Sequence, residues 1–317
     1  MEKRKLGESD LNLAPLVLGG NVFGWTIDKK TSFDLLDTFV GKGFNSVDTA
    51  NSYSAWVPGN KGGESETIIG EWLRNSGKRK DLFIFTKVGD PIPGDGKGLS
   101  ESQIVYQAEL SLKRLQTDYI DLYFSHKDDL DTPVEETLSA YDKLIKQGKV
   151  RYIGASNFLV PRLRESLNMS LFKGFPAYVA DQPKYNLLDR TYENELQSYV
   201  KRHNIGVVTH SSLANGFLSG KYRTEEDISK STRKENVASY FSKKGDVIDK
   251  LEKLSKDSGY SMATLALGWI LKNETITAPI ASATSISQLN ELMRISEPEL
   301  LQLPLESISE NISDKLN

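Results

Sequence analysis

Eight apolar runs of strand length alternate with segments of helical periodicity along nearly the whole chain. We place the strands at residues 14–19, 44–49, 82–88, 120–126, 151–156, 178–183, 206–211 and 276–281. Strands joined by helical crossovers pair in parallel, because each crossover returns the chain to the same end of the sheet. Eight such units predict a (β/α)8 TIM barrel, and the alternative is a doubly wound open sheet.

Local signals place the ends of two helices. Thr132, Pro133 and a glutamate three residues after the threonine predict a helix with a capping box, and Gly148 is placed to end it. Ser100 and Gln103 predict a second capping box ahead of another helix.

The remaining segments are expected to be less regular. Residues 2–13 predict a short hairpin ahead of the first strand, covering the floor of the barrel. The polar segment 213–244 is a long connection for which we expect little structure of its own, and we expect the charged tail from Leu300 to be loosely ordered. Neither a linker nor a shift in composition interrupts residues 1–317, which predicts a single domain.

The composition excludes several functional classes. A net charge of −3 without a block of either sign gives no case for nucleic acid or a membrane surface as a partner, and nothing indicates a protein partner. No apolar stretch reaches the length of a membrane span and no signal region follows the N-terminal charges, which predicts a cytoplasmic protein. Cysteine is absent, so disulfides and thiolate chemistry are excluded. The three histidines form no paired ligand motif, so we expect no metal and disfavour a metal-dependent hydrolase.

Polar residues end three consecutive predicted strands at equal intervals. Asp48, Lys87 and His126 are separated by 39 residues each, which is about the length of one strand–helix–strand unit. Tyr53 follows Asp48 after one turn. Because reactive groups in a barrel of this kind lie at the carboxyl ends of the strands, we expect these four side chains to share one mouth.

These four groups suit the protonation of a carbonyl oxygen. Tyrosine is a weak acid with an ordinary pKa of about 10. The Lys87 ammonium can lower the pKa of Tyr53, and Asp48 can hold that ammonium in place. His126 can donate a hydrogen bond to the same oxygen, while the hydride itself must come from a cofactor. Taken singly, each residue would be assigned to a structural ion pair or to packing; together they indicate a catalytic site.

Longer motifs around these residues resemble the aldo-keto reductase family from about residue 3 to about residue 295. The matching segments are 46–53, 85–88, 118–126, 148–158, 182–190 and 211–222. The resemblance implies a (β/α)8 fold and NADP(H)-linked reduction of a small-molecule aldehyde or ketone. It implies Tyr53 as the general acid, Lys87 and Asp48 as the residues that tune it, and His126 as the group that orients the carbonyl.

The same resemblance implies a cofactor that lies extended across the barrel mouth. Ser156, Asn157 and Gln182 match positions that hold the nicotinamide carboxamide, and residues 211–221 match the family's pyrophosphate loop. The cofactor-binding positions that follow are His210, Ser211, Leu213, Asn215, Gly216, Lys221, Arg233, Ser282, Thr284, Gln288 and Glu291. Trp25 and Trp56 lie in loops after the first two strands and are expected to wall the substrate pocket, with core packing as the alternative.

This sequence departs from the family pattern at several positions that are expected to bind the cofactor. His210 stands where the family has a tyrosine or tryptophan stacked on the nicotinamide, and it can become charged at mildly acidic pH. Ser282, Thr284 and Gln288 replace a segment that often carries a cation, so NAD(H) stays an alternative to NADP(H). Leu292 replaces an adenine-contacting asparagine.

A second function is compatible with the same motifs. Some barrels of this family resemble potassium-channel β subunits, in which the interface with a partner outweighs turnover, and residues 211–221 resemble those as well. The alternative is therefore a cofactor-binding regulatory module with little turnover.

Overall fold

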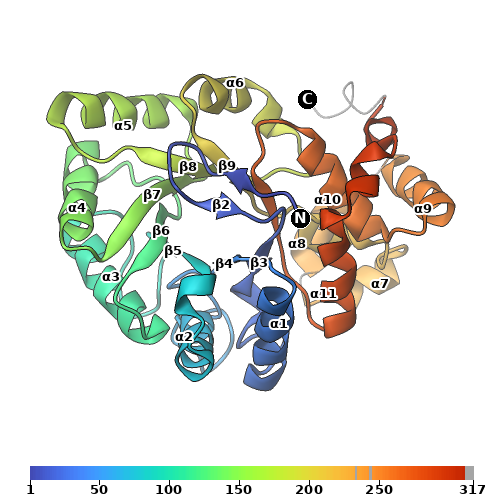
Figure 1. Cartoon of the computed structure of the whole chain (residues 1–317), viewed down its shortest axis with the longest axis horizontal. Coiled ribbons are helices and arrows are strands. Elements are labelled where there is room, and N and C mark those ends of the chain that lie inside the picture. Colours follow the sequence, from blue (N-terminus) through green and yellow to red (C-terminus); the bar gives the residue numbers. More distant parts are fainter. Residues whose placement is uncertain (233, 243–244, 311–317) are drawn as a thin grey trace.

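The computed structural model describes residues 1–232, 234–242 and 245–310. Eight parallel strands close into a barrel, and helices form a ring outside it (Figure 1). In the order in which they neighbour one another, the strands are β10 (Ala278–Ala281), β3 (Val17–Gly19), β4 (Ser46–Asp48), β5 (Phe83–Val88), β6 (Ile120–Ser125), β7 (Val150–Ser156), β8 (Tyr178–Gln182) and β9 (Gly206–Thr209). This closure confirms the predicted TIM barrel, and the open-sheet alternative is wrong.

Amphipathic helices connect the strands. They are α1 (Lys29–Gly41), α2 (Glu64–Ser76), α3 (Glu101–Leu115), α4 (Val134–Lys146), α5 (Val160–Lys173), α6 (Glu195–Arg202), α9 (Val247–Ser258), α10 (Met262–Lys272) and α11 (Ile286–Met293). In α4, the residues Leu138, Tyr141 and Leu144 recur at helical spacing and are fully buried against the barrel. This apolar stripe of α4 packs on the outer face of the sheet, where the helix contacts β7.

The two predicted capping boxes are only partly formed. The Ser100 hydroxyl accepts the Gln103 backbone N–H at 3.4 Å, as predicted, but the Gln103 side chain donates to the carbonyl of Asp95 instead of returning to Ser100. At α4 the prediction is wrong: Pro133 occupies the N-cap, and the Thr132 hydroxyl donates to a carboxylate of the preceding loop. A partner in a neighbouring loop competes with the local cap in both cases.

The predicted hairpin closes one end of the barrel. Strands β1 (Arg4–Lys5) and β2 (Asn12–Leu13) pair in antiparallel fashion and lie across the centre of the ring of strands in Figure 1. Leu6, Leu11 and Leu13 are fully buried and join the apolar residues that fill the barrel interior. The hairpin therefore acts as a hydrophobic plug at the end opposite the polar strand ends.

Two segments contain more structure than the sequence predicts. The connection 213–244 forms η4 (Ala214–Ser219), α7 (Glu225–Ser229) and α8 (Lys234–Phe241), which bury apolar residues such as Phe217 against the core. The tail forms η6 (Pro298–Gln302) and η7 (Leu305–Ile308) against α10, with Leu300, Leu305 and Ile308 buried. In both segments, isolated apolar residues within charged stretches provide the packing against the core. Because these residues do not recur at a helical or strand period, a search for hydrophobic periodicity does not find them.

No helix within the described ranges is long and apolar enough to cross a bilayer.

One buried carboxyl group lies on the outer face of the sheet without a partner. Asp181 precedes the inward-facing Gln182 and is 1% exposed, and neither of its oxygens finds a hydrogen-bond partner among the described residues. Burial raises the pKa of the Asp181 carboxyl well above its usual range. The folded protein therefore binds a proton here that the unfolded chain releases above about pH 4.

Because the folded-state pKa is raised, stability falls as pH rises from the unfolded pKa of Asp181 toward its folded value. We expect Asp181→Asn to raise the midpoint of thermal unfolding by a few degrees at pH 8 and by clearly less at pH 5. Asp118→Asn, at an exposed turn position, serves as the control and should shift the midpoint at neither pH. An Asp181→Asn effect of equal size at both pH values would contradict this explanation.

Candidate active site

The inward-facing rows of the barrel change from apolar to polar where the strands end. Phe85, Phe124, Ala180, Val208 and Ile280 belong to the apolar interior. Successive inward positions in a strand are two residues apart. The next inward positions on these strands are Lys87, His126, Gln182, His210 and Ser282. Strand periodicity alone therefore brings a set of polar groups to the mouth of the barrel.

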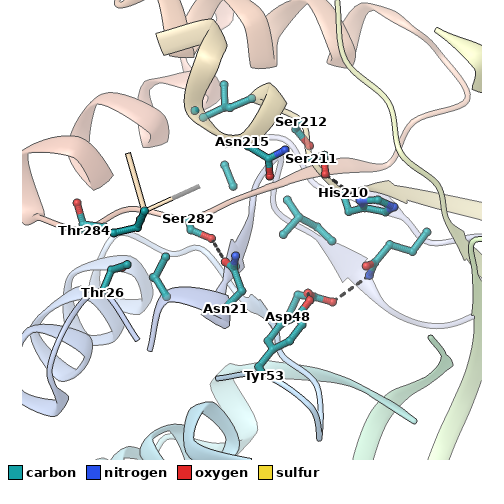
Figure 2. A pocket seen from close by; sticks show the side chains of 18 of the residues that line it. Asn21, Thr26, Asp48, Tyr53, His210, Ser211, Ser212, Asn215, Ser282 and Thr284 are labelled. Atoms are coloured by element: carbon teal, nitrogen blue, oxygen red, sulfur yellow. Dashed lines mark hydrogen bonds between the residues drawn. The ribbon is translucent and has the colours of Figure 1, made fainter. Parts of the chain in front are cut away.

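A fully buried ammonium group lies at the centre of this set. The Nζ atom of Lys87 donates to Asp48 Oδ2 at 2.7 Å, to the carbonyl of Thr49 at 2.8 Å and to Tyr53 Oη at 2.8 Å. The phenol of Tyr53 also lies 3.4 Å from Asp48 Oδ2 (Figure 2). Burial lowers the pKa of the Lys87 ammonium, and the adjacent Asp48 carboxylate opposes that shift. Three of the four predicted catalytic groups are thus in direct contact.

Gln182 joins this cluster from across the barrel. Its amide donates to Asp48 Oδ1 at 2.9 Å, which leaves each carboxylate oxygen of Asp48 with a partner. The predicted role of Gln182 was contact with a carboxamide, and the structure places its N–H on Asp48. Gln182 therefore orients the carboxylate that holds Lys87.

His126 completes the predicted group of four. Its backbone N–H donates to the carbonyl of Val88 at 2.8 Å, and its ring centroid lies 5.9 Å from that of Tyr53. Its Nδ1 atom lies 3.0 Å from Oδ2 of Asp90, a residue that the sequence analysis did not single out. Burial lowers the pKa of His126, while Asp90 raises it.

Two tryptophans stand beside the phenol. The ring of Trp56 lies 6.1 Å from that of Tyr53 and 5.3 Å from that of Trp25, both with edge-on geometry. Trp56 is 49% exposed, so core packing does not account for it. Neither ring belongs to the lining of the cavity that begins at Tyr53, so their place in a substrate pocket stays a prediction.

A cavity of about 460 Å³ extends from Tyr53 toward η4 and the end of β10, as seen from close by in Figure 2. The predicted site residues that line it are Asp48, Tyr53, His126, Ser156, Asn157, Gln182, His210, Ser211, Leu213, Asn215, Gly216, Lys221, Ser282, Thr284 and Gln288. Lys87 lies beneath the cavity floor. The structure therefore gathers segments from six strand ends around one groove.

Some predictions fall outside this groove. The side chain of Glu291 is directed to Arg294, 3.8 Å away, and is not part of the lining, whereas Arg233 lies outside the described residues. Conversely, the sequence analysis missed Asn21 and Thr26, which line the cavity. Asn21 accepts a hydrogen bond from Ser282 across the groove. Its position just after a strand was a signal that could have revealed it.

The environment of the His210 ring favours its uncharged form. Its Nε2 atom lies 3.0 Å from Asn157 Oδ1 and its Nδ1 atom lies 3.1 Å from the Ser211 hydroxyl. Burial, assisted by the charge of Lys87, lowers the pKa of His210 to about 3. The expectation that this ring becomes charged at mildly acidic pH is therefore wrong.

Backbone geometry supports a specialised site. Asn157, Ser211 and Asn215 adopt positive φ angles of 58°, 53° and 56°. Non-glycine residues in this left-handed region are uncommon and gather at binding sites. Among the described residues, no cluster of acidic or histidine side chains could hold a metal ion.

A family model described as the aldo/keto reductase family matches residues 15–310. The chain belongs to the aldo/keto reductase family. Members of this family are oxidoreductases that generally use nicotinamide cofactors. The groove and the four polar groups thus occupy the part of the barrel where the family resemblance implies catalysis.

Several relatives cover almost the whole chain. Uncharacterized oxidoreductase YrpG of Bacillus subtilis (strain 168) is 37% identical over 314 residues, covering 95% of this chain and 92% of its own length. A probable voltage-gated potassium channel subunit beta of Arabidopsis thaliana is 33% identical, with 99% and 98% covered. Aldo-keto reductase YhdN of Bacillus subtilis (strain 168) is 32% identical, with 91% and 85% covered.

The buried ion pair makes a stability prediction. Asp48→Asn leaves the Lys87 ammonium buried without its counter-charge, so we expect the free energy of unfolding, measured by urea titration, to fall by about 3 kcal/mol. Glu71→Gln removes one partner of the more exposed Lys29–Glu71 pair. This variant should change the free energy of unfolding by less than about 0.5 kcal/mol. Similar losses of unfolding free energy in the two variants would show that the buried pair contributes no more to stability than the exposed one.

Proposed function

We propose that this protein reduces the carbonyl group of a small aldehyde or ketone, with NADP(H) as the hydride donor. The contact that carries the proposal is the 2.8 Å hydrogen bond from the buried Lys87 ammonium to the phenol oxygen of Tyr53. An ammonium in this position stabilises the phenolate that remains after the phenol has released its proton. Few structural roles for a tyrosine need a buried cation at its oxygen.

Each residue then has a defined task. When bound, the cofactor supplies a hydride to the carbonyl carbon. Tyr53 transfers its proton to the carbonyl oxygen, so that the product is an alcohol and the phenolate is left beside Lys87. Asp48 holds Lys87, and Gln182 holds Asp48. His126, beside Tyr53, orients the same oxygen.

The groove suits a dinucleotide. Ser156 and Asn157 lie at the Tyr53 end of the lining, where their hydroxyl and amide groups suit a carboxamide. Lys221 also lines the groove, where its ammonium lies 4.9 Å from the ring centroid of Tyr222 and has no carboxylate partner among the described residues, so its charge is available to a phosphate. Thr284 and Gln288 offer neutral hydrogen-bonding groups beyond it. We favour NADP(H) over NAD(H) on the strength of the family resemblance, since a cation at the pyrophosphate serves both cofactors equally.

A regulatory role is the second candidate. Relatives from Arabidopsis thaliana and Oryza sativa subsp. japonica, 33% and 32% identical, are both named as probable voltage-gated potassium channel beta subunits. Tight retention of cofactor without turnover of any carbonyl compound would favour this role. The presence of a complete acid–base cluster favours the enzyme.

Removal of one oxygen atom tests the role of Tyr53. We expect Tyr53→Phe to lower NADPH oxidation with an aldehyde such as 4-nitrobenzaldehyde at least 100-fold, because no other group can deliver the proton from that position. NADPH binding, followed by fluorescence, should change by less than about twofold. Tyr106→Phe, at an exposed tyrosine of α3, is the matched control and should retain full activity. Unchanged turnover in Tyr53→Phe would refute the assignment.

The affinity of the protein for NADPH tests the proposed contact between Lys221 and a phosphate. We expect Lys221→Met to weaken NADPH binding about tenfold, the loss of roughly one charge-assisted hydrogen bond. Lys173→Met, at a surface pair on α5, should leave affinity unchanged. Equal affinity of the Lys221→Met and native proteins for NADPH would remove Lys221 from the cofactor site.

A further inference from the structure

A carboxylate lies against the imidazole that faces Tyr53. Oδ2 of Asp90 is 3.0 Å from Nδ1 of His126, and Oδ1 is 2.8 Å from the ammonium of Lys127. The side chains of Asp90 and His126 are only 29% and 15% exposed. Although burial alone would raise the pKa of Asp90, its contacts with His126 and Lys127 hold that pKa well below its usual range. Asp90 is therefore a carboxylate throughout the physiological range.

Adjacent strands fix this contact. Asp90 follows β5 through Gly89, whose φ of 120° favours glycine. His126 follows β6, and its backbone N–H is held by the carbonyl of Val88 at 2.8 Å. The carbonyl of His126 accepts from the amide of Asn157 at 3.0 Å. The backbone around both residues is thus tied to three neighbouring strands, and the contact between their side chains follows from that arrangement.

The contact decides which ring nitrogen carries a proton. A neutral imidazole has one N–H and one lone pair. A lone pair on Nδ1 would face the negative charge of Asp90 at 3.0 Å, whereas an N–H there is attracted to it. The ring N–H and the carboxylate are not yet in line for a hydrogen bond, which is common in catalytic sites without substrate. Nδ1 therefore keeps a proton in every charge state of the ring.

The proton on Nδ1 restricts the hydrogen bonds that Nε2 of His126 can form. With the proton on Nδ1, Nε2 of the neutral ring can only accept a hydrogen bond. It can donate one to a carbonyl oxygen only when the ring is an imidazolium. A histidine without this carboxylate could instead donate from Nε2 while neutral.

We propose that Asp90 is a positioning residue that fixes the tautomer of His126, so that His126 orients a carbonyl only as the imidazolium. The inference rests on the proposed carbonyl reduction. The charge state of His126 thereby favours carbonyl reduction at lower pH.

The charges around the ring come from several elements. Burial and the Lys87 ammonium on β5 lower the pKa of His126. Asp90, after the same strand, and Asp48 on β4 raise it. Lys127 neutralises part of the charge of Asp90. Because the net shift is downward, we expect kcat/KM for reduction to fall as pH rises through a value below the ordinary 6.5 of histidine.

The variant Asp90→Asn tests, in two ways, whether Asp90 fixes the tautomer of His126. The asparagine has no charge and can donate to Nδ1, which makes the neutral Nε2–H form available. In pH profiles of aldehyde reduction with NADPH, the native enzyme should lose activity tenfold per pH unit above the His126 ionisation. We expect this break to vanish from the profile of Asp90→Asn. Lys127→Met, which keeps the carboxylate, is the matched control and should retain the break.

The second readout is independent of turnover. Long-range ¹H–¹⁵N spectra of the ¹⁵N-histidine-labelled full chain at pH 8 distinguish the two neutral tautomers, and His126→Gln assigns the resonance among only three histidines. We expect the Nδ1–H form in the native protein and the Nε2–H form in Asp90→Asn. The Nε2–H form in the native protein, or an unchanged pH break in Asp90→Asn, would overturn the proposal. Absence of turnover in the native protein together with the Nδ1–H form would refute the proposed function while leaving the tautomer assignment supported.

Discussion

The site depends on an ammonium group with no exposed surface. Burying such a charge is costly unless every N–H finds an acceptor. Lys87 meets this requirement with a carboxylate, a backbone carbonyl and a phenol oxygen, all supplied by residues 48–53. These acceptors are in place only if β4 and β5 pair in one register, with Asp48 beside Phe85. The strand pairing therefore places the ammonium that holds Tyr53, which lies in the turn after β4.

Much of this arrangement could be predicted because it rests on strand periodicity. Each of the eight predicted strands is present, although the first one begins at Val17 instead of residue 14. Since inward positions repeat every two residues, the polar residue that ends a strand must face the same opening as its counterparts on neighbouring strands. Asp48, Lys87 and His126 meet for this reason alone. The predicted hairpin within residues 2–13 is likewise present.

Contacts between distant segments could not be predicted in this way. Gln182 and Asp48 are 134 residues apart and touch only because the barrel closes. Asp90 resembled many other loop aspartates until the fold brought it beside His126. The helices within 213–244 escaped notice because single buried residues such as Phe217 and Val237, without a repeating stripe, anchor them. The caps failed similarly, since tertiary partners replaced the local ones.

The amide of Asn157 contacts the backbone of one functional histidine and the ring of another. Its nitrogen donates to the backbone carbonyl of His126, and its oxygen lies against Nε2 of His210. Asn157 can satisfy both contacts in only one orientation, since a flipped amide would set its oxygen against a carbonyl. A displacement of the His126 backbone or of the His210 ring therefore strains the same planar group. The chain segments after β6 and β9, which carry these two histidines, are therefore joined through a single amide group.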